Sequence, residues 1–212
     1  MVKLYVADIL SLPDPLSVPE VLQTLPLERQ KRIHNMKQEK SRKQSMGVGL
    51  LLQKVLALYH MQDSDVFVDE HGKPKVEGLE FSLSHSGNLV LCAVSEEPVG
   101  CDIERLREAP KGVAERYFSD AEQAYLSHFS ADEHDREFFW IWTMKESYVK
   151  MTGEGLRVSF EAYEIAMEDT GARVIRHGEM QSCYLSTMEL EGYIMSICAE
   201  SSASVEIIWE DL

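Results

Sequence analysis

Residues 139–150 constrain the fold more than any other part of the chain. On a helix, four apolar residues would share one face at the spacing of a buried stripe: Ile141, Met144, Tyr148 and Met151. Glu146 and Lys150, four positions apart, would lie together on the other side, with Trp142 one turn earlier. One face would then sit in a core, while the other presents a carboxylate, an ammonium and an indole. A solvated Glu–Lys pair is the simplest interpretation of that second face.

A second motif lies about forty residues upstream, at 99–104, and reads Val-Gly-Cys-Asp-Ile-Glu. On a strand, Asp102 and Glu104 would share one face and the apolar residues would share the other. Neighbouring carboxylates repel each other, so they are either solvated or hold a cation between them. Together with Glu146 they would form a three-carboxylate oxygen cage, which suits Mg²⁺.

The paired motifs resemble a known signature. Val99-Gly-Cys-Asp-Ile-Glu104 followed by Trp142-Thr-Met-Lys-Glu-Ser-Tyr-Val-Lys150 is similar to the signature of the 4′-phosphopantetheinyl transferases, and the order and separation also match. The resemblance extends over nearly the whole chain and is closer to the long, pseudo-dimeric type that activates peptide and polyketide synthases. It implies an α+β fold of two similar subdomains related by a pseudo-two-fold axis. A faint echo between 81–95 and 184–199 agrees with a duplication, and we place the subdomains at residues 1–103 and 104–212.

The resemblance implies transfer of the phosphopantetheine arm of coenzyme A to a serine of an acyl or peptidyl carrier protein, with release of 3′,5′-ADP. Mg²⁺, with Mn²⁺ as the alternative, would be held by Asp102, Glu104 and Glu146. Either Glu146 or Glu122 would accept the serine proton, and Lys150 would contact phosphate. Glu122 also fits a capping box that starts at Ser119, so a purely structural role stays open for it.

The resemblance also implies a set of coenzyme A contacts: Arg29, Arg32, Lys73, Ser84, His85 and Lys150. The two arginines belong to a basic island at 29–43, which holds seven basic residues and one acidic residue and would attract a polyanion. An arginine expected before the core helix of the first half falls on Gln44, and Arg42 and Lys43 are the neighbouring candidates to replace it. The ordinary alternatives are a turn lysine at position 73 and a solvated histidine at position 85.

Composition excludes other classes of protein. The formal net charge of −15 argues against general nucleic-acid binding. No apolar run is long enough to span a bilayer, and the N-terminus lacks the layout of a signal peptide. The four scattered cysteines form no CxxC pair, which indicates buried, reduced thiols and a cytoplasmic location. We expect a monomer, because both halves of the proposed seam are present in one chain.

Hydrophobic patterning predicts the elements around these motifs. Strands are expected at 2–10, 66–68, 79–83, 89–94, 99–103, 162–167, 182–188, 193–199 and 205–209, and those at 79–103 should form an antiparallel meander. Helices are expected between 20 and 61, broken near Pro26 and around Ser41, and at 115–129. Residues 130–135 resemble a polar loop, and glycines at 153 and 155 should end the signature helix.

Two other function classes remain open at this point. A Mg²⁺-dependent phosphohydrolase built from the same carboxylates would release phosphopantetheine to water. A non-catalytic acidic interaction module would use them only as a solvated face. Transfer to a carrier serine separates the transferase from the hydrolase, and protection of the fold by coenzyme A and a divalent metal would count against the module.

Overall fold

The computed structural model describes residues 1–155, 162–168, 171–201 and 204–212 as a mixture of helices and strands, so the predicted α+β class is confirmed. The first part of the chain forms β1 (Val2–Asp8), a 3₁₀ turn (Pro15–Ser17), α1 (Pro19–Leu22), α2 (Leu27–Asn35), α3 (Glu39–Leu58), a second 3₁₀ turn (Asp63–Asp65), β2 (Phe67–Val68), β3 (Pro74–Lys75), β4 (Glu80–Ser86) and β5 (Leu89–Ser95). The remainder forms β6 (Val99–Arg105), α4 (Val113–Tyr117), α5 (Asp120–Leu126), α6 (Ala131–Thr152), β7 (Tyr163–Glu168), β8 (Gly171–Arg176), β9 (Glu179–Met180), β10 (Tyr184–Leu190), β11 (Tyr193–Ala199) and β12 (Val205–Trp209).

One arrangement of a strand, a long helix and a hairpin occurs twice. The first copy comprises β1, α3, β4 and β5, and the second comprises β6, α6, β10 and β11. In each copy the first strand pairs antiparallel with the last, which gives the orders β1-β5-β4 and β6-β11-β10. The division at residues 103 and 104 stays a prediction, and β6, which spans it, pairs with the second copy.

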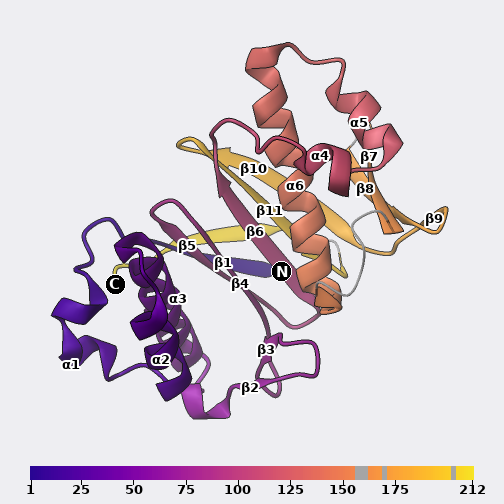
Figure 1. Cartoon of the computed structure of the whole chain (residues 1–212). Helices are drawn as coiled ribbons and strands as arrows, with labels where there is room; N and C mark the ends of the chain where they lie inside the picture. Colours follow the sequence, from indigo (N-terminus) through magenta and orange to yellow (C-terminus); the bar gives the residue numbers. More distant parts are fainter. Residues whose placement is uncertain (156–161, 169–170, 202–203) are drawn as a thin grey trace.

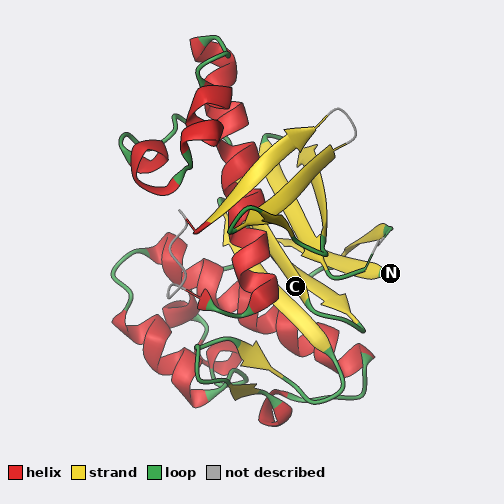
Figure 2. Cartoon of the chain, turned by 90° about the vertical axis from the view of Figure 1, so that its right-hand side faces the viewer, coloured by secondary structure: helices red, strands yellow, loops and turns green. Residues whose placement is uncertain are grey.

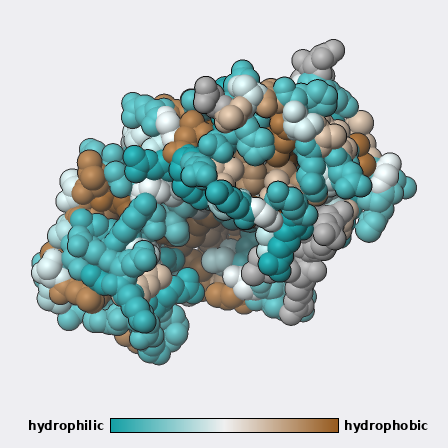
Figure 3. Space-filling view, turned by 45° about the horizontal axis from the view of Figure 1, so that its top comes forward, coloured by the Kyte–Doolittle hydropathy of each residue, from teal (hydrophilic) through white to brown (hydrophobic). Residues whose placement is uncertain are grey.

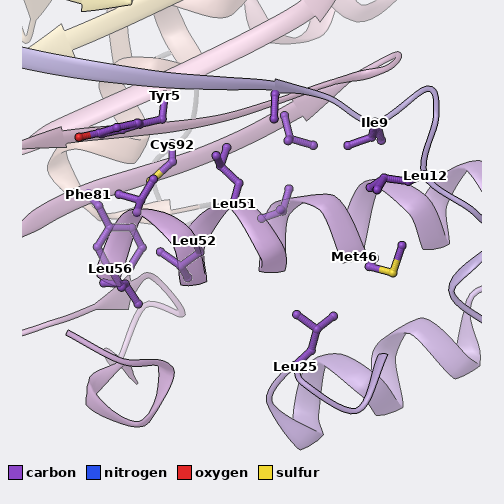
Figure 4. Packing of buried hydrophobic residues seen from close by; sticks show 14 of the residues in the cluster. Tyr5, Ile9, Leu12, Leu25, Met46, Leu51, Leu52, Leu56, Phe81 and Cys92 are labelled. Carbon is purple, nitrogen blue, oxygen red and sulfur yellow. The ribbon is translucent and has the colours of Figure 1, made fainter. Parts of the chain in front are cut away.

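Each long helix covers the sheet of its own copy (Figure 1). The apolar face of α3 packs on β1, β4 and β5, and one buried cluster contains Leu51 and Leu56 of the helix together with Tyr5, Phe81 and Cys92 of the strands (Figure 4). The view in Figure 2 shows α6 lying across the strands of the second sheet, β6 and β11 among them. A third apolar cluster, drawn from β1, β5, β6 and β11, fills the space between the two sheets.

Two glycines on α3 allow close packing with neighbouring side chains. A Cβ added at Gly47 would lie 2.4 Å from Cγ2 of Ile9, and one at Gly49 would lie 2.7 Å from Cδ of Arg29. Within the described ranges, no helix has the combination of length and apolar character needed to cross a membrane. All four cysteines are buried and none forms a disulfide, as expected.

Serine hydroxyls join β4 to β6. The two strands lie side by side and run in the same direction, but they belong to different sheets. Three alternate serines of β4 accept hydrogen bonds from backbone N–H groups of β6: Ser82 from Cys101 (3.0 Å), Ser84 from Ile103 (3.3 Å) and Ser86 from Arg105 (3.0 Å). We call this junction the serine seam. It lets the unpaired edge of β6 satisfy its amides without a backbone ladder.

The structure corrects the expected meander. The strand at 99–103 is present, but it pairs with β11 and not with β5, so the meander ends after two strands. Hydrophobic alternation identified β6 as a strand, but alternation carries no information about which neighbour a strand pairs with. The short hairpin strands β8 and β9 were not predicted.

Three helix boundaries also differ from the prediction. The break expected around Ser41 lies at residues 36–38, and the expected helix at 115–129 is divided into α4 and α5 by the N-cap Ser119. Residues 131–135 are the first turn of α6 and not a loop. Ser130 and Glu133 form a capping box there, a pattern that favours helix initiation even in a polar segment.

Gly100 allows α6 to lie directly on β6. A Cβ at this position would be 1.9 Å from the carbonyl oxygen of Ser147 and 2.4 Å from the amide nitrogen of Met151. We expect Gly100→Ala to displace α6 and to lower the free energy of unfolding by about 3 kcal/mol or more, because backbone atoms cannot move aside locally. Urea denaturation measures this loss. The matched control is Gly49→Ala, where the added methyl meets only side-chain atoms of Arg29 and Leu25. A loss at Gly100 no larger than at Gly49 would contradict the expectation.

Candidate active site

One pocket brings together the residues of both sequence motifs. Its lining comes from β4, β6 and α6: Leu83, Ser84, His85, Asp102, Glu104, Trp142, Glu146 and Lys150. A second, more apolar pocket adjoins it and shares Leu83, Glu146 and Lys150. Its outer wall is formed by the turn at 71–74 and the glycines that follow α6. The space-filling view shows a hollow near the middle of one face, with hydrophilic residues around most of its rim (Figure 3).

The two predicted faces of α6 are confirmed. Ile141, Met144 and Tyr148 are at most 3% exposed and lie in the core of the second copy. Glu146 and Lys150 face β6 and the pocket. The glycine at position 100 makes this approach close enough for α6 side chains to contact those of β6.

Asp102 is almost fully buried and is held by two donors. Ser84 Oγ donates to Oδ1 of Asp102 at 2.7 Å, and Lys150 Nζ donates to the same oxygen at 2.6 Å. Burial by itself would lower the pKa of Lys150, but Asp102, Cys101 and Glu146 together outweigh burial and leave that pKa above its usual value. The simple Glu146–Lys150 surface pair is therefore not what the structure contains, because Lys150 pairs with Asp102.

Glu104 is held in a similar way. Ser86 Oγ donates to Oε2 of Glu104 at 2.9 Å, and Arg107 Nη1 donates to the same oxygen at 2.8 Å. The Arg107 guanidinium also lies 4.7 Å from the ring centroid of Phe139. Arg107 therefore reaches its carboxylate from the outer side of the pocket, since its side chain is about half exposed.

Glu146 is the third carboxyl group in the pocket. Among the residues that the structure describes, none forms a hydrogen bond or an ion pair with the side-chain carboxyl group of Glu146. Burial and the negative charges of Asp102 and Glu104 raise the pKa of Glu146 to about 7, and the Lys150 ammonium opposes them. Its carboxyl group therefore changes protonation near neutral pH, as a general base needs to do.

The carboxyl groups of Asp102, Glu104 and Glu146 are suitable ligands for a hard divalent cation. In this structure two of them form ion pairs instead, Asp102 with Lys150 and Glu104 with Arg107. Among the described residues, no cluster of three or more His, Cys, Asp or Glu is arranged to hold a metal ion. Three carboxyl groups and one ammonium, that of Lys150, line the pocket, and burial together with the charges of Asp102 and Glu104 raises the pKa of Glu146. Carboxylate oxygens are the ligands that Mg²⁺ prefers.

Glu122, the second candidate base, lies away from the pocket. Both of its oxygens accept from Lys145 Nζ, at 2.9 and 2.8 Å, and neither side chain is exposed. The carboxylate also accepts the backbone N–H groups of Ser119 and Ile165, each at 2.7 Å. The capping box at Ser119, proposed as the structural alternative, is present. Glu122 thus joins α5, α6 and β7 and is not brought to the site.

The predicted coenzyme A contacts are divided between the pocket region and the surface of α2. Lys73 lines the adjoining pocket, where burial lowers its pKa and its ammonium donates to the Met151 carbonyl at 3.4 Å. Ser84, His85 and Lys150 line the carboxylate pocket. Arg29 donates to the Ser45 carbonyl at 3.1 Å, and Arg32 is exposed; neither lines these two pockets.

The neighbourhood of Gln44 is engaged in structural contacts. Gln44 donates to the Gly87 carbonyl at 3.0 Å. Arg42 holds Asp14 and two backbone carbonyls at 36–37, and Lys43 pairs with Glu39. Arg42 therefore fixes the link between α2 and α3, and in this arrangement it does not replace the basic residue expected at position 44.

Sequence reasoning missed Ser86, Arg107 and Gly100. A signal for the serine was present, because the i, i+2 spacing of Ser84 and Ser86 is repeated by Asp102 and Glu104. Arg107 lies three residues after Glu104, but nothing in a loop sequence indicates where its side chain turns. The importance of Gly100 appears only once α6 is seen to cross β6.

Comparison with known proteins places the chain in a family. Residues 98–198 match the model of the 4′-phosphopantetheinyl transferase superfamily. The protein Sfp of Bacillus subtilis, a 4′-phosphopantetheinyl transferase, is 32% identical over 181 residues, which cover 82% of this chain and 81% of Sfp. The transferase gsp of Aneurinibacillus migulanus is 35% identical over 62% of this chain and 56% of its own length. A solved holo-(acyl-carrier-protein) synthase from Bacillus anthracis aligns with a TM-score of 0.42 and 23% identity, covering 50% of this chain and 96% of that one.

These sequence matches show that the chain belongs to the 4′-phosphopantetheinyl transferase superfamily. Within that superfamily it is of the long type represented by Sfp, whose length it matches over about four fifths.

Proposed function

We propose that this protein transfers the 4′-phosphopantetheine arm of coenzyme A to a serine of an acyl or peptidyl carrier protein and releases 3′,5′-ADP. The observation that supports this most is the single pocket in which Asp102, Glu104, Glu146 and Lys150 meet. With a divalent cation on its carboxylates, such a pocket could bind a diphosphate and remove a proton from an incoming hydroxyl, and the reaction needs little else from the protein.

Glu146 is the proposed general base. It lines both pockets, and in the metal-free protein its pKa is raised to about 7, so that it is a carboxylate at slightly alkaline pH. It would accept the proton of the carrier serine as the serine oxygen attacks the β-phosphorus of the diphosphate. The bond from that phosphorus to the bridging oxygen breaks, and the oxygen leaves with 3′,5′-ADP. Glu122 is not part of this proposal, because Lys145 and two backbone amides occupy its oxygens.

Lys150 and His85 are the proposed phosphate contacts in the pocket, and Lys73 the contact in its neighbour. Lys150 would exchange part of its pairing with Asp102 for a phosphate oxygen, which it would bind as a point charge. Arg29 and Arg32, on the outer helix α2, are proposed to attract the nucleotide end through the basic island.

Mg²⁺, with Mn²⁺ as an alternative, is the proposed metal. Asp102, Glu104 and Glu146 would hold it, and its charge would neutralise the diphosphate. For this to happen, Asp102 and Glu104 must release at least part of their contacts with Lys150 and Arg107. We also propose that the protein is a monomer in the cytoplasm and that it binds neither nucleic acid nor membranes.

The test is mass spectrometry of an apo carrier protein incubated with this protein, coenzyme A and Mg²⁺. We expect the carrier to gain one phosphopantetheine arm, and we expect chelator or Asp102→Ala to prevent the gain. An exposed substitution that lines neither pocket, Glu97→Gln, serves as the control and should leave the gain intact. Release of free phosphopantetheine with no carrier modification would instead identify a hydrolase.

A further inference from the structure

The serine seam repeats one geometry along β4 and β6. Ser84 donates to the carboxylate eighteen positions later and accepts from the backbone N–H nineteen positions later. Ser86, two residues further along β4, donates to the Glu104 carboxylate and accepts from the backbone N–H of Arg105. Ser82 accepts from the N–H nineteen positions later, but the residue eighteen positions later is Gly100, which has no side chain.

A serine hydroxyl has a single proton, so the orientation of the Ser86 hydroxyl is set by its two partners. At Ser86, the N–H of Arg105 occupies a lone pair and the proton points to Oε2 of Glu104. Ser86 is only 9% exposed, and its backbone lies in β4, which is paired with β5. The hydroxyl is therefore a fixed donor on the inner side of Glu104.

The other donor to Glu104 comes from a different direction. Arg107 lies in the loop after β6, its side chain is 48% exposed, its guanidinium lies over the ring of Phe139, and it is not among the residues that line the carboxylate pocket. With Ser86 removed, only this outer contact would hold Glu104. A glutamate has three rotatable side-chain bonds, so its carboxylate would then follow Arg107 away from Asp102 and Glu146.

We propose that Ser86 is a positioning residue that keeps the Glu104 carboxylate inside the pocket in the orientation that a divalent cation requires. The proposal rests on the function proposed above, because it assumes that Glu104 is a metal ligand. Hydrogen bonds of this kind to ligating carboxylates typically alter metal affinity by about 10- to 100-fold.

The seam supplies its own control. Ser86→Ala and Ser82→Ala each leave one β6 amide without its hydroxyl acceptor, but only Ser86→Ala also removes a hydrogen bond to a carboxylate. The two variants should lose similar stability in urea. Titration of each full-length protein with Mn²⁺ alone, followed by the loss of the free-ion electron paramagnetic resonance signal, then separates them. We expect Ser86→Ala to bind about tenfold more weakly, Ser82→Ala to remain within about twofold of the wild type, and Ser86→Thr to recover most of the affinity.

Equal Mn²⁺ affinities for Ser86→Ala and Ser82→Ala would overturn the proposal, as would a wild-type chain that binds no Mn²⁺. The carrier assay reports separately on the proposed function. If Mn²⁺ binding responds to Ser86 as expected while no carrier gains mass, the role of Ser86 stands and the transfer reaction fails.

Discussion

Replacing Glu146 with glutamine is expected to abolish transfer and, at the same time, to stabilise the metal-free protein at alkaline pH. The first effect follows from the loss of the proposed base and metal ligand. The second follows from electrostatics, because the Glu146 carboxylate is buried beside Asp102 and Glu104 and its pKa is raised from 4.5 to about 7. A neutral amide of the same shape removes that repulsion.

The sign of the pH dependence follows from proton linkage. Between the unfolded pKa and a folded pKa of about 7, the native state binds the proton and the unfolded state does not, so the stability of the wild type falls as the pH rises through this window. The loss is complete above about pH 7, and its upper limit is about 3 kcal/mol. Glu146→Gln should therefore exceed the wild type by up to that amount at about pH 8 and by little at about pH 4.

Urea denaturation in chelator at both pH values tests this expectation. Glu97→Gln, an exposed position, is the control and should show no comparable gain. Added Mg²⁺ should stabilise the wild type and not Glu146→Gln, since a ligand stabilises only the fold that binds it. A variant that is no more stable than the wild type at alkaline pH would show that Glu146 is not under electrostatic strain.

The largest loss of stability from a single side chain is expected for Lys145→Met. This change would leave the Glu122 carboxylate buried without its cation, since both side chains of the pair have no exposed surface. Removing one partner of a buried pair costs about 3–5 kcal/mol. Thermal and urea unfolding would measure the loss. We expect α5, α6 and β7 to lose their contacts with one another in one step, because the Lys145–Glu122 pair and the Tyr163 carbonyl join them.

A double variant distinguishes the effect of the unpaired Glu122 charge from the effect of losing the packing of the Lys145 side chain. Lys145→Met combined with Glu122→Gln leaves no unpaired charge, and we expect it to regain a large part of the loss. The exposed pair of Arg173 and Glu168 provides the comparison, and Arg173→Met should cost less than about 1 kcal/mol. A double variant as unstable as Lys145→Met would show that the shape of the lysine, and not the uncompensated charge of Glu122, determines the stability.

The chemistry of the site could be predicted further than the connections of the fold. The spacing of apolar residues placed Glu146 and Lys150 on the pocket side of α6, and alternation placed Asp102 and Glu104 on one face of β6. Both results follow from periodicity within a single element. The α+β class also followed from local patterns and the family resemblance.

The failures concern relations between elements. The local sequence does not indicate that β6 pairs with β11 and not with β5. It also does not indicate that Lys150 pairs with Asp102 and not with Glu146. Glu122 illustrates the same limit, because its capping box was visible in the sequence but its buried partner, Lys145, is 23 residues away. Long-range pairing is decided by packing and desolvation over the whole chain, which no window of sequence contains.

The pairing of the last strand with the first has a consequence for biosynthesis. β1 lies between β5 and β12, and its parallel partner is residues 205–209, at the other end of the chain. On the ribosome, the edge of β1 that faces β12 therefore stays open until residues 205–209 have been synthesised. A nascent chain that stalls short of β12 would present the open edge of β1 as a template for strands from other molecules, so β12 protects β1 from aggregation.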